Sequence, residues 1–484
     1  MQENISLKEI KEKSGQGVTW VGGVEVLIRG VQFGATVTLA RLLMPEDFGL
    51  ISIAFIFTQF SYVLFDFGLG SALIQKKDLS DSHFSTVFWS YLALAFVFAS
   101  LVLVLAGPVA VYFRMPQVGN ILKVLSAIFF LYALNAIPFI RLMKDIRFKQ
   151  LTLAQLASVM VYAMVAIGMA FMGYGVWSFV FGSLSEQFIL ILLLYKITGW
   201  RPKFYFNREQ IIELFRFGKN VLATRLLSYF NLNAPQFAIG KILGTGPLGY
   251  YSVAFQMVEI PVQRISKNVL KVMFPAFSKL QDQEQDYVHM YRRTVYYLAI
   301  IVFPVFAGLY VIAPAFIRAF YGGKWQAVVA PLQILTLVGL FRSLMMNNSL
   351  VFLSKGKPYV DSLLNLGYAL LLVPFLFLVT PLGLLKVTVL LAVFTFVLFV
   401  SGQIVSARIL GVSFGSLVIL YRVPLLGILG FLALIKWLEP LYFHRLSSWL
   451  QMLVYIGIAV PVYMIVVMLQ DRQVFKKIKG LLHS

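Results

Sequence analysis

The sequence contains no cysteine, only four histidines and little charge. The absence of cysteine excludes disulfides, thiolate metal sites and cysteine nucleophiles. Charged residues make up 13% of the 484 residues, whereas a soluble domain has about a quarter. Acidic residues are the scarcer charged group, with 20 Asp and Glu against 41 Lys and Arg, so the net charge is +21. These shortages argue against an ordinary soluble protein.

Long hydrophilic segments are missing as well. The longest run roughly over 195–210 and 276–293, and neither can hold a folded soluble domain. Nucleic-acid binding would need a solvated basic face, which no segment here can carry, so we expect no nucleic-acid partner. Any function must be carried out within a membrane or at its surfaces.

Apolar segments dominate the chain instead. Hydrophobic residues make up 60% of it, and the mean hydropathy is +0.84. Apolar runs of about 18–25 residues recur along the whole length, and they lack the alternation of membrane β-strands. We therefore predict an all-α polytopic membrane protein. It should have about fourteen transmembrane helices, centred near residues 28, 58, 95, 130, 160, 185, 225, 258, 300, 340, 368, 395, 427 and 458.

The distribution of Lys and Arg predicts the orientation of these helices. If the chain starts inside and alternates, the inner segments collect roughly 27 basic residues and the outer turns roughly seven. This bias predicts that both termini lie in the cytoplasm. The positive charge is then largely a topology signal, which also attracts anionic membrane lipids.

Two stretches match each other at a spacing of 200 residues. Residues 40–55 read ARLLMPEDFGLISIAF, and residues 240–255 read GKILGTGPLGYYSVAF. The repeat predicts two pseudo-symmetric six-helix lobes, 1–200 and 201–411, followed by a helix pair and a cytoplasmic tail in 412–484. In membrane proteins this architecture is typical of a transporter with its site between the halves.

Ionisable residues inside the predicted spans are the candidates for that site, because a charge in hydrocarbon usually faces water or a partner. The first span carries polar residues spaced 4, 3 and 4, which places them on one helical face: Glu25, Arg29, Gln32 and Thr36. The positions 200 residues later are Arg225, Tyr229, Leu232 and Gln236. The two halves thus share a polar stripe but differ in charge.

Two neighbouring spans carry polar faces as well. The eighth has Gln256, Glu259, Gln263 and Lys267, with Arg264 beside them, and the second has Gln59, Tyr62 and Asp66. We predict that these faces line one water-filled cavity. Several arginines and few carboxylates favour an anion, since guanidinium matches phosphate oxygens. The predicted headgroup-binding residues are Arg29, Arg225, Arg264, Arg342, Tyr229 and Gln236.

Simpler interpretations stay open for several of these residues. Glu25 and Arg29 could only neutralise each other along one helix. Arg264 could extend to the inner membrane surface. Asp66 could satisfy backbone groups at a helix break.

The motifs FDFGLGSALIQKKDLS (65–80), ARLLMPEDFGLIS (40–52), VMFPAFSKLQDQ (272–283) and GGKWQAVVAPLQILTLVGLFRS (322–343) carry a family resemblance. The chain resembles the Wzx-type polysaccharide flippases of the multidrug/oligosaccharidyl-lipid/polysaccharide (MOP) exporter superfamily. The last two motifs are fairly specific to the WzxC-like branch, which serves lipopolysaccharide and exopolysaccharide biosynthesis. Asp66, Lys324 and Arg342 lie in matching motifs.

The resemblance implies a transporter rather than an enzyme. It would move undecaprenyl-pyrophosphate-linked oligosaccharide across the bacterial inner membrane by alternating access, next to other polysaccharide-export proteins. It implies no cofactor or metal beyond a coupling ion, H⁺ or Na⁺. The candidates for coupling are Glu25, Asp66 and Glu259, because a carboxylate in a low-dielectric site can take up a proton. The alternatives are a lipid II flippase, a drug exporter and, in another class, an oligosaccharide polymerase or ligase.

Overall fold

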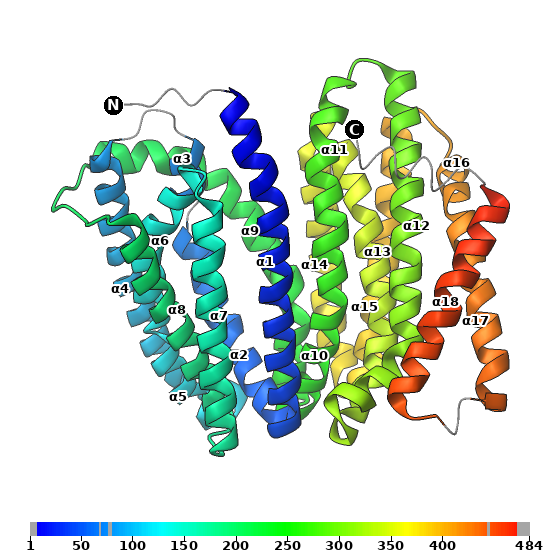
Figure 1. Ribbon diagram of the computed structural model, residues 1–484, viewed down its shortest axis with the longest axis horizontal. Coiled ribbons are helices and arrows are strands. Elements are labelled where there is room, and N and C mark those ends of the chain that lie inside the picture. Colours follow the sequence, from blue (N-terminus) through cyan, green and yellow to red (C-terminus); the bar gives the residue numbers. More distant parts are fainter. Residues whose placement is uncertain (1–6, 67–68, 76–79, 443–445, 472–484) are drawn as a thin grey trace. The chain divides into compact units, whose positions relative to one another are not determined.

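A computed structural model describes residues 7–66, 69–75, 80–442 and 446–471, apart from some side chains within them. Every regular element in these ranges is a helix (Figure 1). The chain forms two compact units, Met1–Asn233 with Gly244–Gly246, and Ala234–Leu243 with Pro247–Ser484. The division falls within α9 (Arg208–Ile242), which contributes to both.

The first unit is built from helices that pack side by side. Besides the first part of α9 they are α1 (Leu7–Leu42), α2 (Pro45–Asp66), α3 (Leu69–Gln75), α4 (Asp81–Phe113), α5 (Pro116–Leu125), α6 (Ile128–Lys144), α7 (Phe148–Phe171) and α8 (Trp177–Thr198). Val24 and Ile28 of α1 pack on Val159 of α7. A second apolar cluster joins α6, α7 and α8. Apolar side chains that recur every three or four residues thus hold α1 against the rest of the unit.

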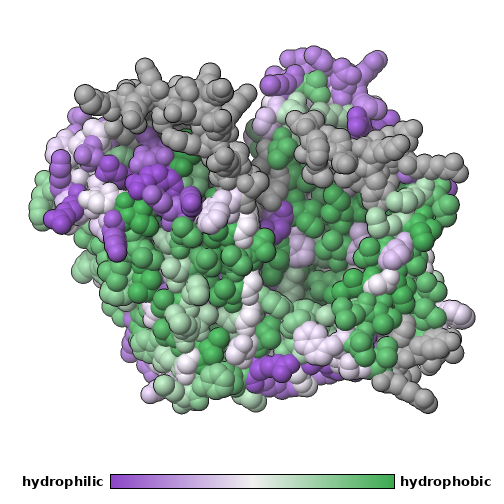
Figure 2. All heavy atoms as spheres, viewed as in Figure 1, coloured by the Kyte–Doolittle hydropathy of each residue, from purple (hydrophilic) through white to green (hydrophobic). Residues whose placement is uncertain are grey.

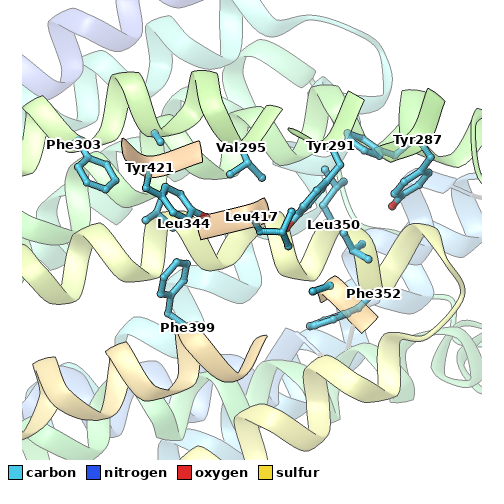
Figure 3. Packing of buried hydrophobic residues seen from close by; sticks show 14 residues of the cluster. Tyr287, Tyr291, Val295, Phe303, Leu344, Leu350, Phe352, Phe399, Leu417 and Tyr421 are labelled. Atoms are coloured by element: carbon cyan, nitrogen blue, oxygen red, sulfur yellow. The ribbon is translucent and has the colours of Figure 1, made fainter. Parts of the chain in front are cut away.

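The second unit contains the longer series of helices. They are α10 (Thr245–Pro261), the π-helix η1 (Val262–Ser266), α11 (Lys267–Lys279), α12 (Glu284–Phe316), η2 (Ile317–Tyr321), η3 (Gly323–Val328), α13 (Val329–Ser354), α14 (Pro358–Val379), η4 (Thr380–Leu382), α15 (Leu384–Ile409), α16 (Phe414–Val418), η5 (Ile419–Tyr421), α17 (Arg422–Tyr442) and α18 (Ser448–Gln470). A large buried cluster of this unit lies among α11, α12, α13, α15 and α16–η5. There Phe303 stacks on Tyr421, which also contacts Phe399, while Tyr291 lies on the side of Leu350 and Leu417 (Figure 3).

The last two long helices pack on the same unit. Tyr463 of α18 donates a hydrogen bond to the carbonyl of Ile300 in α12, at 2.9 Å. A Cβ atom on Gly427 of α17 would lie 2.6 Å from the Tyr463 ring, so the missing side chain lets α17 approach α18 closely. This pair is therefore part of the second unit rather than a separate body.

Ten helices in the described ranges are long and apolar enough to cross a membrane. Ten of the fourteen predicted centres fall within them, which confirms a multi-pass helical membrane protein. Apolar side chains cover the flanks of the helices, while hydrophilic ones gather at the helix ends (Figure 2). The four other centres lie on α1, α2, α9 and α10, the helices that carry the predicted polar faces.

The 200-residue repeat reappears in the helix boundaries. α1 ends at Leu42 and α2 begins at Pro45, while α9 ends at Ile242 and α10 begins at Thr245. The two copies make their turns differently. Asp47 accepts a hydrogen bond from the amide of Met44 at 3.0 Å, whereas the equivalent Gly244 has a φ of 90°. A side-chain cap in one copy thus corresponds to a glycine-dependent turn in the other.

Candidate functional site

An ion pair joins α10 to α13 in the second unit. Nη1 of Arg342 lies 2.6 Å from Oε2 of Glu259, and its Nη2 lies 3.5 Å from Oε1. The two side chains are 20% and 19% exposed. Because water only partly surrounds the pair, its attraction is stronger than that of an ordinary surface pair. Both residues were predicted from the sequence, but in separate roles.

Neighbouring side chains hold this pair in place. Gln263 donates a hydrogen bond to the carboxylate of Glu259. The guanidinium carbon of Arg342 lies 5.7 Å from the centre of the Phe255 ring, within cation–π range. Gln263 belongs to the π-helix η1, which begins directly after Pro261. Proline has no amide hydrogen and disrupts the α-helical ladder, and π-turns often mark functional positions.

A glycine sets the distance between the helices of the pair. Gly339 lies three residues before Arg342 on α13. A Cβ atom there would lie 2.3 Å from Cε1 of Phe306 and 2.5 Å from Cγ1 of Val258. Only glycine therefore lets α13 pack this closely on α10 and α12. The sequence contains Gly339 but gives no sign of this contact, because its partners are distant in the chain.

The first unit contains a second, more exposed ion pair. Nη2 of Arg29 lies 2.9 Å from Oε1 of Glu25, and its Nη1 lies 2.8 Å from Oε1 of Gln32. The spacing argument is thus confirmed, since these three side chains share one face of α1. Arg29 is 56% exposed and Glu25 is 32% exposed. The simpler interpretation, in which Glu25 and Arg29 neutralise each other along one helix, therefore also agrees with the structure. The side chain of Arg29 stays exposed in spite of this pairing.

Tyr229 has a structural partner. Its hydroxyl donates to the carbonyl of Ile56 on α2, and its ring lies 5.6 Å from that of Phe60. The side chain is 8% exposed, so it fixes α9 to α2 within the first unit. A sugar could reach this hydroxyl only by displacing that bond. Its role in sugar binding stays a prediction.

The remaining candidates lie in different places. Gln236 is half-buried on α9, and Arg264 is exposed on η1. The side chains of Arg225 and Asp66 lie outside the described residues. The structure also contains a carboxylate that the sequence reasoning missed. Asp361, in the first turn of α14, accepts a hydrogen bond at 2.9 Å from Ser349 of α13.

The Glu259–Arg342 pair has the chemistry to bind an anion. A guanidinium offers a planar fork of donors to phosphate oxygens. In the described structure Arg342 directs two of its nitrogens at Glu259. A phosphate and this carboxylate would therefore compete for the same donors. Neutralising the carboxylate would therefore favour the binding of an anion to Arg342.

The fold is that of a known class of membrane transporters. The structure superimposes on the "Lipid II flippase MurJ, inward closed conformation" with a TM-score of 0.75, covering 94% of this chain and 99% of that chain, at 15% sequence identity. At this identity the likeness concerns the fold alone. The chain is thus a helical multi-pass membrane protein with the fold of that flippase.

Comparison of sequences gives the family. Residues 38–330 match the family model described as "Polysaccharide biosynthesis protein", and the chain belongs to this family. It is 26% identical over 355 residues to the lipopolysaccharide biosynthesis protein WzxC of Escherichia coli (strain K12), which covers 73% of this chain and 72% of WzxC. It is 25% identical over 310 residues to the succinoglycan biosynthesis transport protein ExoT of Rhizobium meliloti (strain 1021), which covers 64% of this chain and 62% of ExoT.

Proposed function

We propose that this protein is a flippase that moves lipid-linked oligosaccharide units across the bacterial inner membrane for surface polysaccharide export. Its membership of the polysaccharide biosynthesis family, matched over 38–330, carries the proposal. The fold shared with a lipid II flippase supports transport rather than catalysis. The lipid carrier in this proposal is undecaprenyl pyrophosphate, whose charge suits the arginines.

The proposed architecture has fourteen transmembrane helices in two six-helix lobes plus the pair α17 and α18, with both termini in the cytoplasm. The repeated helix break at Leu42–Pro45 and Ile242–Thr245 supports two related halves. Alternating access then follows from the rocking of these halves around one substrate site. Membrane lipids surround the helices, and other polysaccharide-export proteins would act on the product.

The Glu259–Arg342 pair gives this cycle a coupling step. In the described structure the carboxylate of Glu259 holds the guanidinium of Arg342 at 2.6 Å. When a proton or Na⁺ neutralises Glu259, Arg342 is released to bind the pyrophosphate. By thermodynamic linkage, bound pyrophosphate raises the affinity of Glu259 for the ion by the same factor. Glu25 and Arg29 of α1, whose charged groups lie 2.9 Å apart, would act in the same way: neutralisation of Glu25 would release Arg29 to bind the pyrophosphate.

Translocation by purified protein in vesicles tests the function. The substrate is a fluorescent undecaprenyl-pyrophosphate oligosaccharide added to one leaflet, and the readout is its appearance in the other. We expect the wild type to move it and Arg342→Gln to be at least about tenfold slower, since charge-assisted hydrogen bonds to phosphate contribute roughly 1.5–3 kcal/mol. Arg408→Gln, an exposed cation at the end of α15, is the matched control and should transport normally.

Further arms of the same assay separate the alternatives. Transport of lipid II in preference to the oligosaccharide lipid would assign the protein to the lipid II class, and transport of organic cations alone would make it a drug exporter. Joining of oligosaccharide units without translocation would identify a polymerase. A proton gradient and a sodium gradient, imposed separately, identify the coupling ion. Coupling that survives Glu259→Gln would remove this residue from the mechanism.

A further inference from the structure

Residues 199–210, which connect α8 to α9 and include the first turn of α9, are bound along the first turns of α4. They include the loop that extends beside α4 in the first unit (Figure 1). Trp89 Nε1 donates to the carbonyl of Lys203 at 2.9 Å, and the amide of Lys203 donates to the hydroxyl of Ser85 at 3.3 Å. Trp200 is buried against Phe88, with ring centres 5.5 Å apart. Helix α4 therefore fixes the start of the segment.

The end of the segment is fixed by the same helix. The Thr86 hydroxyl accepts from the amide of Asn207 at 3.3 Å and donates to Oε1 of Gln210 at 3.0 Å. Oδ1 of Asn207 accepts from the amide of Glu209 at 2.8 Å and so caps the start of α9. The segment therefore follows α4 from Trp89 back toward the start of that helix at Asp81.

The length of α4 places this segment at the membrane boundary. Its 33 residues extend about 50 Å, so the helix is longer than a bilayer core of about 30 Å. The first residues, Asp81, Ser82 and His83, are polar, whereas the apolar run extends from Val87 to Phe113, so the excess length lies mainly at the start of the helix. Trp89 lies about 12 Å from the start at Asp81, which is close to that boundary. Phe204 stacks on it, with ring centres 5.1 Å apart and planes 23° apart.

The outer side of the segment is aromatic and basic. Phe204 is 95% exposed, and Tyr205 and Phe206 are 44% and 60% exposed. The exposed charges from 196 to 210 are four cations and one carboxylate, namely Lys196, Arg201, Lys203, Arg208 and Glu209. Aromatic rings beside cations are typical of the boundary between hydrocarbon and headgroups, and basic clusters attract anionic lipid.

We propose that residues 199–210 form a binding site for anionic phospholipids of the surrounding leaflet. The three aromatic side chains enter the headgroup region, and Arg201 and Lys203 bind the phosphates beside them. The hydrogen bonds to α4 hold these groups in position before the lipid binds, which lowers the entropic cost of binding. An acidic soluble protein would also meet the charges, but it would leave three exposed aromatic rings at the membrane boundary without a role.

The natural absence of cysteine allows a direct test. Phe206→Cys introduces a single thiol for an environment-sensitive fluorophore and leaves the Trp89–Phe204 stack intact. The labelled full chain is reconstituted in phosphatidylcholine bilayers that contain phosphatidylglycerol, with bromine on the acyl chains of one lipid or the other. Quenching reports which lipid lies next to the label. These bilayers contain no oligosaccharide lipid, so any enrichment is that of the phospholipid.

We expect brominated phosphatidylglycerol to quench more strongly than brominated phosphatidylcholine at equal mole fraction. Arg201→Gln with Lys203→Gln should lower this enrichment by about fivefold for each cation removed. The swap Arg201→Lys with Lys203→Arg should retain it. Lys357→Gln with Arg408→Gln, which removes the same charge from exposed positions in the second unit, should leave it unchanged.

Two results would overturn the proposal. Equal quenching by both lipids would show an apolar contact without headgroup recognition. Quenching by aqueous iodide, with none from either lipid, would place the segment in water, where a protein partner becomes the better explanation.

Discussion

Arg342 of α13 and Glu259 of α10 form a half-buried ion pair with a shortest distance of 2.6 Å. Removing either charge leaves the other partly desolvated and without its partner. We expect Glu259→Gln and Arg342→Gln each to lower the free energy of unfolding by about 1–3 kcal/mol. The double variant should lose less than the sum, with an interaction energy of about 0.5–3 kcal/mol. Thermal unfolding of the purified wild type, single variants and double variant measures this double-mutant cycle.

A second double-mutant cycle, with Arg408 in place of Arg342, serves as the control for the first. Glu259→Gln combined with Arg408→Gln should be additive, because Arg408 is exposed at the end of α15 and has no part in the pair. If the Glu259–Arg342 cycle is additive too, the two side chains do not interact, and the coupling step proposed above loses its basis.

Gly339 determines how closely α13 packs on α10 and α12. In Gly339→Ala the new methyl group would overlap Phe306 and Val258, at 2.3 and 2.5 Å. We expect a loss of about 1–3 kcal/mol in unfolding free energy, as in other overpacked cores. Gly308→Ala on α12 is the matched control, because a Cβ there meets nothing within 4 Å. The control should be neutral or slightly stabilised. Equal stability of both variants would contradict the packing described here.

The sequence predicted the parts of this molecule that depend on local pattern. Hydrophobic run length located the ten apolar spans, and the 200-residue repeat located two equivalent helix breaks at Leu42–Pro45 and Ile242–Thr245. Helical spacing also predicted that Glu25, Arg29 and Gln32 share a face, and their side chains are bonded to one another. These features follow from neighbours within a few residues or from a repeated pattern.

The pairing of groups from distant helices could not be predicted in this way. Glu259 and Arg342 are 83 residues apart, and their contact depends on Gly339 and on the π-turn after Pro261. Tyr229 has a suitable residue type for sugar binding, yet its hydroxyl is bonded to the carbonyl of Ile56. Periodicity identifies the face on which a residue lies but not the partner it meets there.

Tyr229→Phe separates the structural role of this hydroxyl from a role in binding. It removes the bond to the carbonyl of Ile56, which lies inside helix α2 and keeps its place in the helical ladder. We expect a loss of about 0.5–1.5 kcal/mol in unfolding free energy. Tyr174→Phe, at a residue that is 55% exposed, should cost almost nothing. Unchanged stability with impaired vesicle transport would instead assign the Tyr229 hydroxyl to the substrate.

Thr86 is the residue of α4 that holds the end of the 199–210 segment. Thr86→Val keeps the shape of the side chain but removes both the acceptor for the Asn207 amide and the donor to Gln210. Each lost bond costs about 1 kcal/mol, so amide hydrogen exchange in residues 203–210 should accelerate by about fivefold or more. Ser90→Ala is the matched control, because its hydroxyl donates at 2.8 Å to the carbonyl of Thr86 within the same helix. It should leave exchange in the segment unchanged. If Thr86→Val gives the same exchange as the wild type, the contacts of the segment with Ser85, Phe88 and Trp89 suffice to hold it, and the hydrogen bonds to Thr86 do not stabilise it.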